Sequence, residues 1–134
     1  MEKVLHVEIL TPNGKYLQSD VEFLSVKSTV AQLGILPNHA PLITQLEICK
    51  LVIKKDGANM IYAIGGGVLT ITKGSNVKLL VNSIEHKDEI DLERALKAKE
   101  RALKRIEEKQ KYDSTRAKAA LARALNRINI VNNY

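Results

Sequence analysis

Apolar and polar residues alternate along several segments before Ser83. From Val4 to Leu10 the alternation is strict, which predicts a strand with one buried face and with His6 on the outer face. Further strand-like segments are Val21–Lys27, Leu46–Lys54, Asn59–Ile64, Val68–Thr72 and Asn76–Ser83. Because Val21–Lys27 is apolar on both faces, we expect an antiparallel β-sandwich or a flattened barrel.

Turn residues separate these strands. Thr11-Pro12-Asn13-Gly14 predicts a turn, and Asp56-Gly57 predicts a hairpin between two of the strands. Gly65-Gly66-Gly67 interrupts the pattern, so we expect the sheet to break there. Consecutive glycines also occur in phosphate-binding loops, but here no Lys-Ser/Thr pair and no helix follows. A bulge or a close approach of two backbones is the preferred interpretation.

The apolar period changes to three and four residues between Ile90 and Val131, which predicts two amphipathic helices. Their apolar stripes are Leu92, Ala95, Leu96, Ala102, Leu103 and Ile106, and then Ala117, Ala120, Leu121, Ala124, Leu125, Ile128 and Val131. Glu107–Asp113 interrupts the stripe without any Gly or Pro, so the junction can bend but is not forced to. Folded as a hairpin, the two stripes bury each other, whereas one continuous helix needs another protein to cover them. We therefore expect an arm with two states that differ by only a few kcal/mol.

Composition divides the 134 residues at the same place. All seven glycines and all three prolines lie at or before Gly74, and all six arginines lie after Ile90. We predict an α+β protein with a β-sandwich domain at residues 1–84 and a C-terminal antiparallel two-helix hairpin at residues 85–134. The chain has no apolar run of about 18 residues and no leader pattern, so we do not expect it to be inserted or secreted. Cys49, the only cysteine, rules out an internal disulfide and is expected in the core of a strand.

The net charge of +6 is concentrated in the arm. Residues 1–84 hold eight lysines and six acidic residues, for a charge of +2, whereas residues 85–134 hold 13 basic and nine acidic residues, for +4. A basic arm can be a solvated surface or can meet an acidic protein, a nucleotide phosphate or a nucleic acid. Nucleic acid is the least favoured partner, because one Phe and four Tyr offer no stacking platform and the interleaved acids repel phosphates.

The sequence contains no recognisable catalytic or metal-binding pattern. No serine lies in a nucleophile-elbow context, and His6, His39 and His86 fall on separate elements without a ligand pair at metal spacing. We therefore expect a non-catalytic protein that has no metal site and requires no cofactor.

The segment from Ala31 to Leu42 is punctuated by Gly34, Pro37 and Pro41 and is apolar where a linker would be polar. It predicts a packed loop of fixed shape, which suits a contact surface. The alternative for His39 is a side chain that merely stabilises a turn.

The order of these parts, together with Gln32-Leu33-Gly34-Ile35-Leu36-Pro37-Asn38-His39-Ala40-Pro41-Leu42 and Gly65-Gly66-Gly67-Val68-Leu69, resembles the epsilon subunit of bacterial F-type ATP synthases. The resemblance implies a rotor component that passes proton-driven rotation of the c-ring to the catalytic head through the gamma subunit. It also implies a place on the cytoplasmic face of the cell membrane, with membrane association only through the complex. The residues expected to contact other subunits are Gln32, Leu33, Gly34, Ile35, Leu36, Pro37, His39, Pro41 and Leu42.

In this family the helical arm inhibits ATP hydrolysis when it extends toward the catalytic alpha and beta subunits, and it releases the enzyme when folded. Epsilon subunits that bind ATP carry an Ile/Leu-Asp-x-x-Arg-Ala motif, which matches the residues from Ile90 to Ala95 here. The resemblance assigns the nucleotide's base and sugar to Glu85 and Asp91, and its phosphates to Arg94, Arg123 and Arg127. We hypothesise that ATP is a regulatory ligand, bound without hydrolysis, that selects the folded arm.

Two alternatives remain open at this point. Asp91 and Arg94 can form a local ion pair or helix start, with Arg123 and Arg127 merely keeping the second helix soluble. The whole chain can also be a structural adaptor between gamma and the c-ring, with a permanently folded arm.

Overall fold

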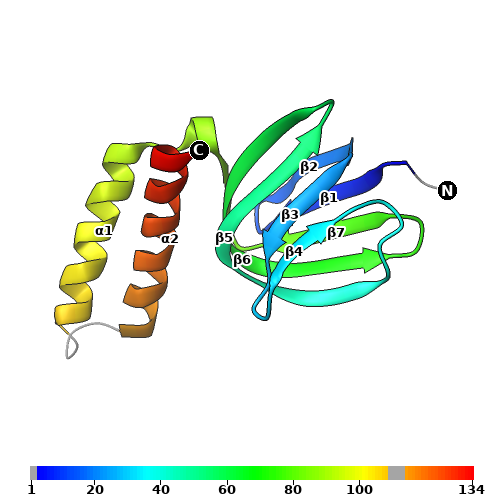
Figure 1. Cartoon of the computed structure of the whole chain (residues 1–134). Coiled ribbons are helices and arrows are strands. Elements are labelled where there is room, and N and C mark those ends of the chain that lie inside the picture. Colours follow the sequence, from blue (N-terminus) through cyan, green and yellow to red (C-terminus); the bar gives the residue numbers. More distant parts are fainter. Residues whose placement is uncertain (1–2, 109–113) are drawn as a thin grey trace.

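The structure, a computed structural model, describes residues 3–108 and 114–134 (Figure 1). A β-sandwich precedes a pair of helices, which confirms the α+β prediction. The strands are β1 Leu5–Thr11, β2 Gly14–Val21, β3 Phe23–Lys27, β4 Gln32–Ile35, β5 Leu42–Lys55, β6 Ala58–Thr72, β7 Asn76–Val81 and β8 Ile84–His86. The helices are the 3-10 turn η1 Lys87–Glu89, α1 Leu92–Glu107 and α2 Ser114–Asn133.

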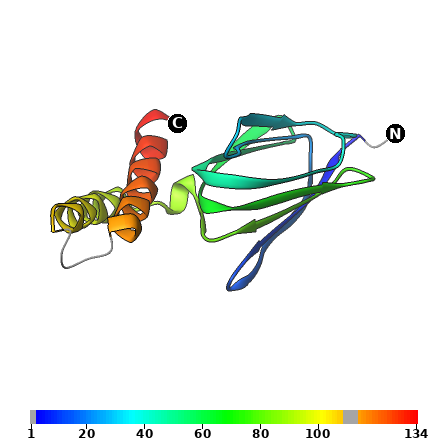
Figure 2. The same ribbon diagram turned by 90° about the horizontal axis from the view of Figure 1, so that it is seen from below.

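The strands form one sheet in the order β2-β1-β7-β6-β5-β3-β4, with β8 paired to β6. All neighbours are antiparallel except β1 and β7, which run parallel. The sheet does not close, and it folds over so that its apolar face covers itself (Figures 1 and 2). The most deeply buried side chains of this core include Leu5, Val7, Ile9, Leu24, Val26, Leu51, Ile53, Ile64, Leu69, Ile71 and Leu79. Burial of these alternating residues is the main stabilisation of the sandwich.

The prediction that the three glycines break the sheet is wrong. β6 runs without interruption from Ala58 to Thr72 and pairs with β5 on both sides of the glycines. A Cβ atom on Gly67 would collide with the carbonyl oxygen of Leu80 in β7, so the two backbones approach closely here. The preferred interpretation, a close backbone approach, is therefore confirmed.

Three strand assignments differ from the prediction. β2 was not predicted, because this edge strand is polar along most of its length. β4 occupies the first part of the expected loop, where Leu33 and Ile35 alternate toward the core. β8 lies beyond Ser83, where strand signals were expected to end, and it pairs with β6 through Ile64 and Tyr62.

Both predicted turns are confirmed. Thr11 pairs with Gly14 across a two-residue loop, and Lys55 pairs with Ala58 across Asp56-Gly57. Asp56 and Gly57 have φ values of 52° and 78°, the left-handed backbone of a type I′ hairpin. Cys49 is buried in β5, as expected.

The helices form the predicted antiparallel hairpin, and α2 lies between α1 and the sandwich (Figures 1 and 2). Small buried residues, Ala95 and Ala102 on α1 and Ala117 and Ala124 on α2, allow the two helices to pack closely. The predicted junction at Glu107–Asp113 lies mostly outside the described residues. Within the described ranges, no helix is long and apolar enough to cross a membrane.

Candidate functional site

The arm is docked on the sandwich through the side chains of Glu85 and Arg127. Glu85 belongs to β8, and its Oε1 accepts a hydrogen bond of 2.7 Å from the Nε of Arg127 on α2. The two side chains are 33% and 31% exposed, so solvent screens their attraction in part. We assign this ion pair roughly 1 kcal/mol.

Two further contacts involve Asn126 in the C-terminal half of α2 and Tyr134, which follows the helix. The amide of Asn126 donates to the backbone carbonyl of Cys49 at 2.8 Å, which brings a bond from α2 to the middle of β5. The Nζ of Lys50 lies 3.5 Å from the ring centroid of Tyr134. We call these two contacts and the Glu85–Arg127 pair the docking contacts. The Asn126 and Arg127 contacts are part-buried polar bonds, and Ile130 of the same helix is fully buried.

Arg123 and Arg127 lie one turn apart on α2, as their spacing predicted. Both line a small cavity against Gly65 and Ser83 at the edge of the sandwich. Arg123 also lines a groove of about 720 Å³ that runs over the three glycines. The structure thus places Glu85, Arg123 and Arg127 around one junction between α2 and the sheet.

The residues at the start of α1 lie differently. Asp91 is the N-cap of α1, and its Oδ1 accepts the backbone amide of Arg94 at 3.1 Å. Arg94 lines a groove with Lys97, Glu100, Arg101 and Lys104 of the same helix. Asp91 is therefore a helix-start acid in this state, which is the local role left open by the sequence. The structure brings Arg127 to Glu85, but it places the Arg94 side chain along α1.

The predicted contact loop is held firmly by the turn between β6 and β7. Asn38, with a φ of 68°, donates its amide to the Oγ of Ser75 at 2.7 Å. The carbonyl of the buried Ser75 accepts the amide of His6 at 2.9 Å, so the loop is tied to β1 as well. These two bonds connect the loop to its neighbours in the sandwich, and its fixed shape stays a prediction.

Within this loop the side chains divide into inner and outer sets. Ile35 is fully buried, whereas Leu36 is 60% exposed. Gln32 donates to the Oγ of Ser25 at 2.9 Å, and the Nδ1 of His39 lies 2.7 Å from the carbonyl oxygen of Ala40. The His39 contact is local, as the turn-stabilising alternative requires. Leu36 is the apolar residue that the loop presents to the outside.

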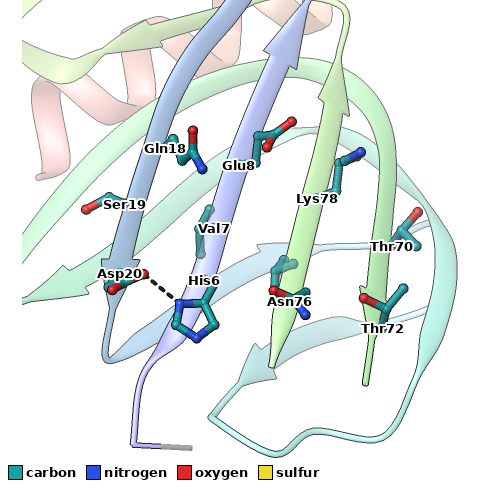
Figure 3. Close-up of a pocket in the computed structure, with 11 residues that line it drawn as sticks. His6, Val7, Glu8, Gln18, Ser19, Asp20, Thr70, Thr72, Asn76 and Lys78 are labelled. Atoms are coloured by element: carbon teal, nitrogen blue, oxygen red, sulfur yellow. Dashed lines mark hydrogen bonds and ion pairs between the residues drawn. The ribbon is translucent and has the colours of Figure 1, made fainter. Parts of the chain in front are cut away.

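The outer face of the sheet has an apolar part and a polar part. Val68 and Leu80 are cross-strand neighbours, and both are exposed, as is Ile43 on β5. We call these three residues the apolar patch. Beside it lies a polar hollow of about 560 Å³ between β2, β1, β7 and β6 (Figure 3). The labelled side chains of the hollow form cross-strand rows, and the Nδ1 of His6 lies 2.7 Å from the carboxylate of Asp20.

Family comparisons match both parts of the chain. Residues 4–87 match the model described as "ATP synthase, Delta/Epsilon chain, beta-sandwich domain". Residues 88–132 match the model described as "ATP synthase, Delta/Epsilon chain, long alpha-helix domain". The chain belongs to the ATP synthase delta/epsilon chain family. This confirms the resemblance inferred from the sequence.

Individual relatives agree with this membership. The chain is 39% identical over 104 residues to the ATP synthase epsilon chain of Bacillus licheniformis, covering 78% of this chain and 79% of the relative. It is 40% identical over 102 residues to the epsilon chain of Halalkalibacterium halodurans, covering 76% of each. As a member of this family the chain is a non-catalytic subunit, as the sequence predicted. The candidate site residues are therefore expected to bind other subunits or a regulatory ligand rather than to catalyse a reaction.

Solved structures show that the fold recurs. A chain in the Euglena gracilis mitochondrial ATP synthase, solved as an OSCP/F1/c-ring assembly, superposes with a TM-score of 0.82 at 20% identity, covering 91% of this chain and 78% of that one. A chain in the Tetrahymena thermophila mitochondrial ATP synthase central stalk and c-ring gives a TM-score of 0.57 at 19% identity, covering 66% of this chain and 69% of that one. At these identities the likeness establishes the fold.

One group of functional interest was missed by the sequence analysis. Tyr16 on β2, Tyr62 on β6 and His86 on β8 stack edge to face, with ring centroids 6.1 Å and 5.1 Å apart. The hydroxyl of Tyr16 donates to Glu89 of η1 at 3.3 Å. Burial, and then the Glu89 charge, raises the pKa of Tyr16 to about 12. We call these four residues the Tyr16 cluster.

The Tyr16 cluster could not be found from sequence because its members come from four separate elements, including β2, which was not predicted. Burial also raises the pKa of Tyr62. A phenol is protonated at neutral pH in any case, and the raised pKa lets Tyr16 donate to Glu89 up to a higher pH than an exposed tyrosine would.

Proposed function

We propose that the chain is a central-stalk subunit of a bacterial F-type ATP synthase, with the sandwich coupling the gamma subunit to the c-ring and the arm regulating ATP hydrolysis. The observation that carries this proposal is the combination of a β-sandwich and a separate helical hairpin whose second helix docks on it through contacts that include the Glu85–Arg127 pair. A rigid body transmits torque, and a lightly docked arm can change its state.

The contacts to gamma and the c-ring are proposed for the loop around Leu36 and for the outer face of the sheet. An exposed apolar patch beside a polar hollow is typical of a protein–protein contact surface. The bond from Asn38 to Ser75 fixes the loop before binding, so little conformational entropy is lost when it docks. Loop and outer face together would hold the sandwich between the two partners.

For the arm, we propose that extension toward the catalytic alpha and beta subunits inhibits hydrolysis. The Glu85–Arg127 pair is partly exposed and therefore weak, so we expect the folded and extended states to differ by only a few kcal/mol. The exposed Leu96 and Leu103 of α1 and the basic residues beside them would be covered by a partner in the extended state. A ligand present at 100 times its dissociation constant adds roughly 2.7 kcal/mol to the state that it binds, enough to choose between them.

ATP is proposed as that ligand, bound at Glu85, Ile90, Asp91, Arg94, Arg123 and Arg127. The support is the junction where Glu85, Arg123 and Arg127 meet, since guanidinium groups bind phosphates through paired hydrogen bonds. The carboxylate of Glu85 accepts the hydrogen bond from the Nε of Arg127, so a phosphate at that nitrogen would have to displace it. Arg94 would need a different side-chain conformation to take part.

Calorimetric titration of the isolated chain with ATP tests the nucleotide site. We expect a binding heat for the native chain, none for an Arg123→Ala/Arg127→Ala variant, and an unchanged heat for an Arg101→Ala control on the outer side of α1. Equal heats for all three proteins would remove the proposed nucleotide site.

Regulation is tested separately by ATPase measurements on a reconstituted catalytic complex with gamma. We expect slower hydrolysis with the full chain than with a chain that ends at Lys87. Identical rates would favour the adaptor function, in which the arm stays folded. The bonds that Glu85 and Cys49 make to α2 are the observation in favour of that second candidate.

A further inference from the structure

A groove of about 720 Å³ runs over Gly65, Gly66 and Gly67, from the apolar patch to the wall formed by α2. We propose that this groove binds an extended segment of the gamma subunit in which a carboxylate lies beside apolar side chains, and that Arg123 binds the carboxylate. The inference rests on the proposed contact with gamma and specifies its chemistry. It adds a residue of the helical arm to a contact surface that otherwise belongs to the sandwich.

The floor of the groove is backbone without side chains. The amide of Gly65 donates to the carbonyl of Ser83 at 3.0 Å. The carbonyl of Gly66 accepts the amide of Asn82 at 2.9 Å, so these two polar groups of the floor are already paired. Because glycine carries no side chain, another backbone can approach this floor closely. An extended segment therefore suits the groove.

One wall of the groove is apolar and open to solvent. Ile43 of β5 is 74% exposed and Val68 of β6 is 37% exposed, and both line the groove. These two residues belong to the apolar patch, so the groove is continuous with the surface already proposed as a contact. Contiguous exposed apolar residues mark sites of protein–protein contact. The apolar side chains of the gamma segment are expected on this wall.

The opposite wall, formed by α2, carries a single charge. Arg123 is half-buried, and within the part of the chain that the structure describes its side chain has no hydrogen bond and no ion pair. Arg127, one turn further on, is already paired with Glu85. None of the other described residues that line the groove is charged. The groove therefore offers one unpaired guanidinium group beside apolar surface, which complements a single carboxylate on an otherwise apolar segment.

A carboxylate suits this groove better than a nucleotide phosphate does. Arg123 also lines the small cavity that it shares with Arg127, where the phosphates of ATP are proposed to bind. That cavity has two guanidinium groups for a highly charged ligand, whereas the groove has one and an apolar wall. The carboxylate is assigned to gamma because the arm acts on the catalytic subunits in the proposed function. The surface beside the arm is then the one nearest to the subunit that joins the c-ring to the catalytic head.

Binding of the full chain to a reconstituted catalytic complex with gamma, measured by surface plasmon resonance without added nucleotide, tests the groove. Arg123→Ala should raise the dissociation constant roughly 10- to 100-fold, the factor for one charge-assisted hydrogen bond, and the increase should shrink in 1 M salt. Ile43→Ala should raise it roughly tenfold, and this increase should persist in salt because the lost contact is apolar. Lys118→Ala removes the same charge from an exposed position of α2 and should leave the dissociation constant unchanged.

Urea unfolding of the free variants separates partner binding from stability. Because the Arg123 side chain has no partner in the described part of the chain, Arg123→Ala should leave the urea midpoint unchanged. A lower midpoint would show that Arg123 supports the folded chain, which counts against the inference. An Arg123→Ala variant that binds the complex as tightly as the native chain overturns the inference alone. A native chain that does not bind the complex overturns the proposed contact with gamma as well.

Cross-linking in the same complex identifies the segment that occupies the groove. In an Arg123→Lys variant, a carbodiimide joins the introduced amine to a carboxylate in direct contact, and mass spectrometry locates the bond. In a separate Ile43→Cys variant, made in a Cys49→Ala background, a benzophenone on the introduced thiol marks the chain that lies over the apolar wall. We expect both links in one short segment of gamma, with the first at an Asp or Glu. A missing link at position 123, links to the alpha or beta subunits, or links to two distant parts of gamma overturn the proposal.

Discussion

Gly67→Ala should be one of the most destabilising single-methyl additions in this sandwich. The new Cβ would collide with the carbonyl oxygen of Leu80 and lie 2.8 Å from the Cα of Val81, both backbone atoms of β7. A side chain could rotate away, but a paired strand can only shift. Because β7 is paired with both β1 and β6, the shift would disturb two sets of ladder hydrogen bonds.

The magnitude follows from two terms. Overpacking against a fixed backbone costs roughly 1 to 3 kcal/mol, and the φ of 156° at Gly67 adds strain that L-residues rarely accept. We therefore expect the free energy of unfolding to fall by about 3 kcal/mol or more, a large fraction of the roughly 5 to 15 kcal/mol that small proteins possess.

Two matched glycines separate these terms. Gly57→Ala, at a φ of 78° with nothing within 4 Å of the added Cβ, reports backbone strain alone and should cost roughly 1 kcal/mol. Gly65→Ala meets mainly the side-chain oxygen of Ser83, which can rotate, and should fall between the two. Urea unfolding followed by circular dichroism gives the three values. A cost for Gly67→Ala no greater than that for Gly57→Ala would refute the close-approach argument.

Three other predictions concern the docking of the arm, the pKa of Tyr16 and the contact loop. A double-mutant cycle with Glu85→Gln and Arg127→Ala should give a coupling free energy of roughly 1 kcal/mol in chemical denaturation, falling in 1 M salt; zero coupling at low salt would contradict the docking role. Alkaline titration followed at 295 nm should show a tyrosine with a pKa of about 12 that disappears in Tyr16→Phe. The Tyr16 phenol ionises near pH 10.0 in the unfolded chain and near 12 in the folded one, so the free energy of unfolding should be unaffected below pH 10 and should fall between these values. The loss should be no more than about 1 kcal/mol, because the site is partly exposed. Uniform titration of all tyrosines near pH 10 would contradict the raised pKa of Tyr16. Ser75→Ala should leave the amide of Asn38 without its acceptor and cost roughly 1 to 2 kcal/mol, with faster hydrogen exchange in the contact loop, whereas an unchanged exchange rate would show that Ser75 does not hold it.

Local patterns in the sequence were sufficient for much of the fold. The alternation from Val4 to Leu10 predicted β1 because side chains of a strand point alternately to its two faces. The three- and four-residue repeats predicted both helices, since they depend on contacts one turn apart. Asp56-Gly57 predicted its hairpin because the left-handed backbone it needs is a property of those two residue types.

The sequence predicted only those features of the candidate site that depend on residues close together in the chain. Spacing correctly placed Arg123 and Arg127 on one side of α2, but it could not show that Arg127 would meet Glu85 while the Arg94 side chain lay along α1. Whether any of them binds ATP stays a prediction. Asn126 and Tyr134 gave no sequence signal, because their partners lie in β5, some eighty residues earlier.

The sequence by itself determined the family, the strand and helix periods, the main turns and the separation of a sandwich from a basic arm. Only the tertiary structure decided that β6 continues through three glycines and that β8 joins the sheet. It also decided that Tyr16, Tyr62, His86 and Glu89 meet where the sandwich leads into the arm. The physical reason is the separation along the chain over which each interaction acts. Periodicity and turn preference act between residues a few positions apart, whereas strand pairing, close backbone approach and the docking of the arm depend on which distant surfaces come together when the core is buried.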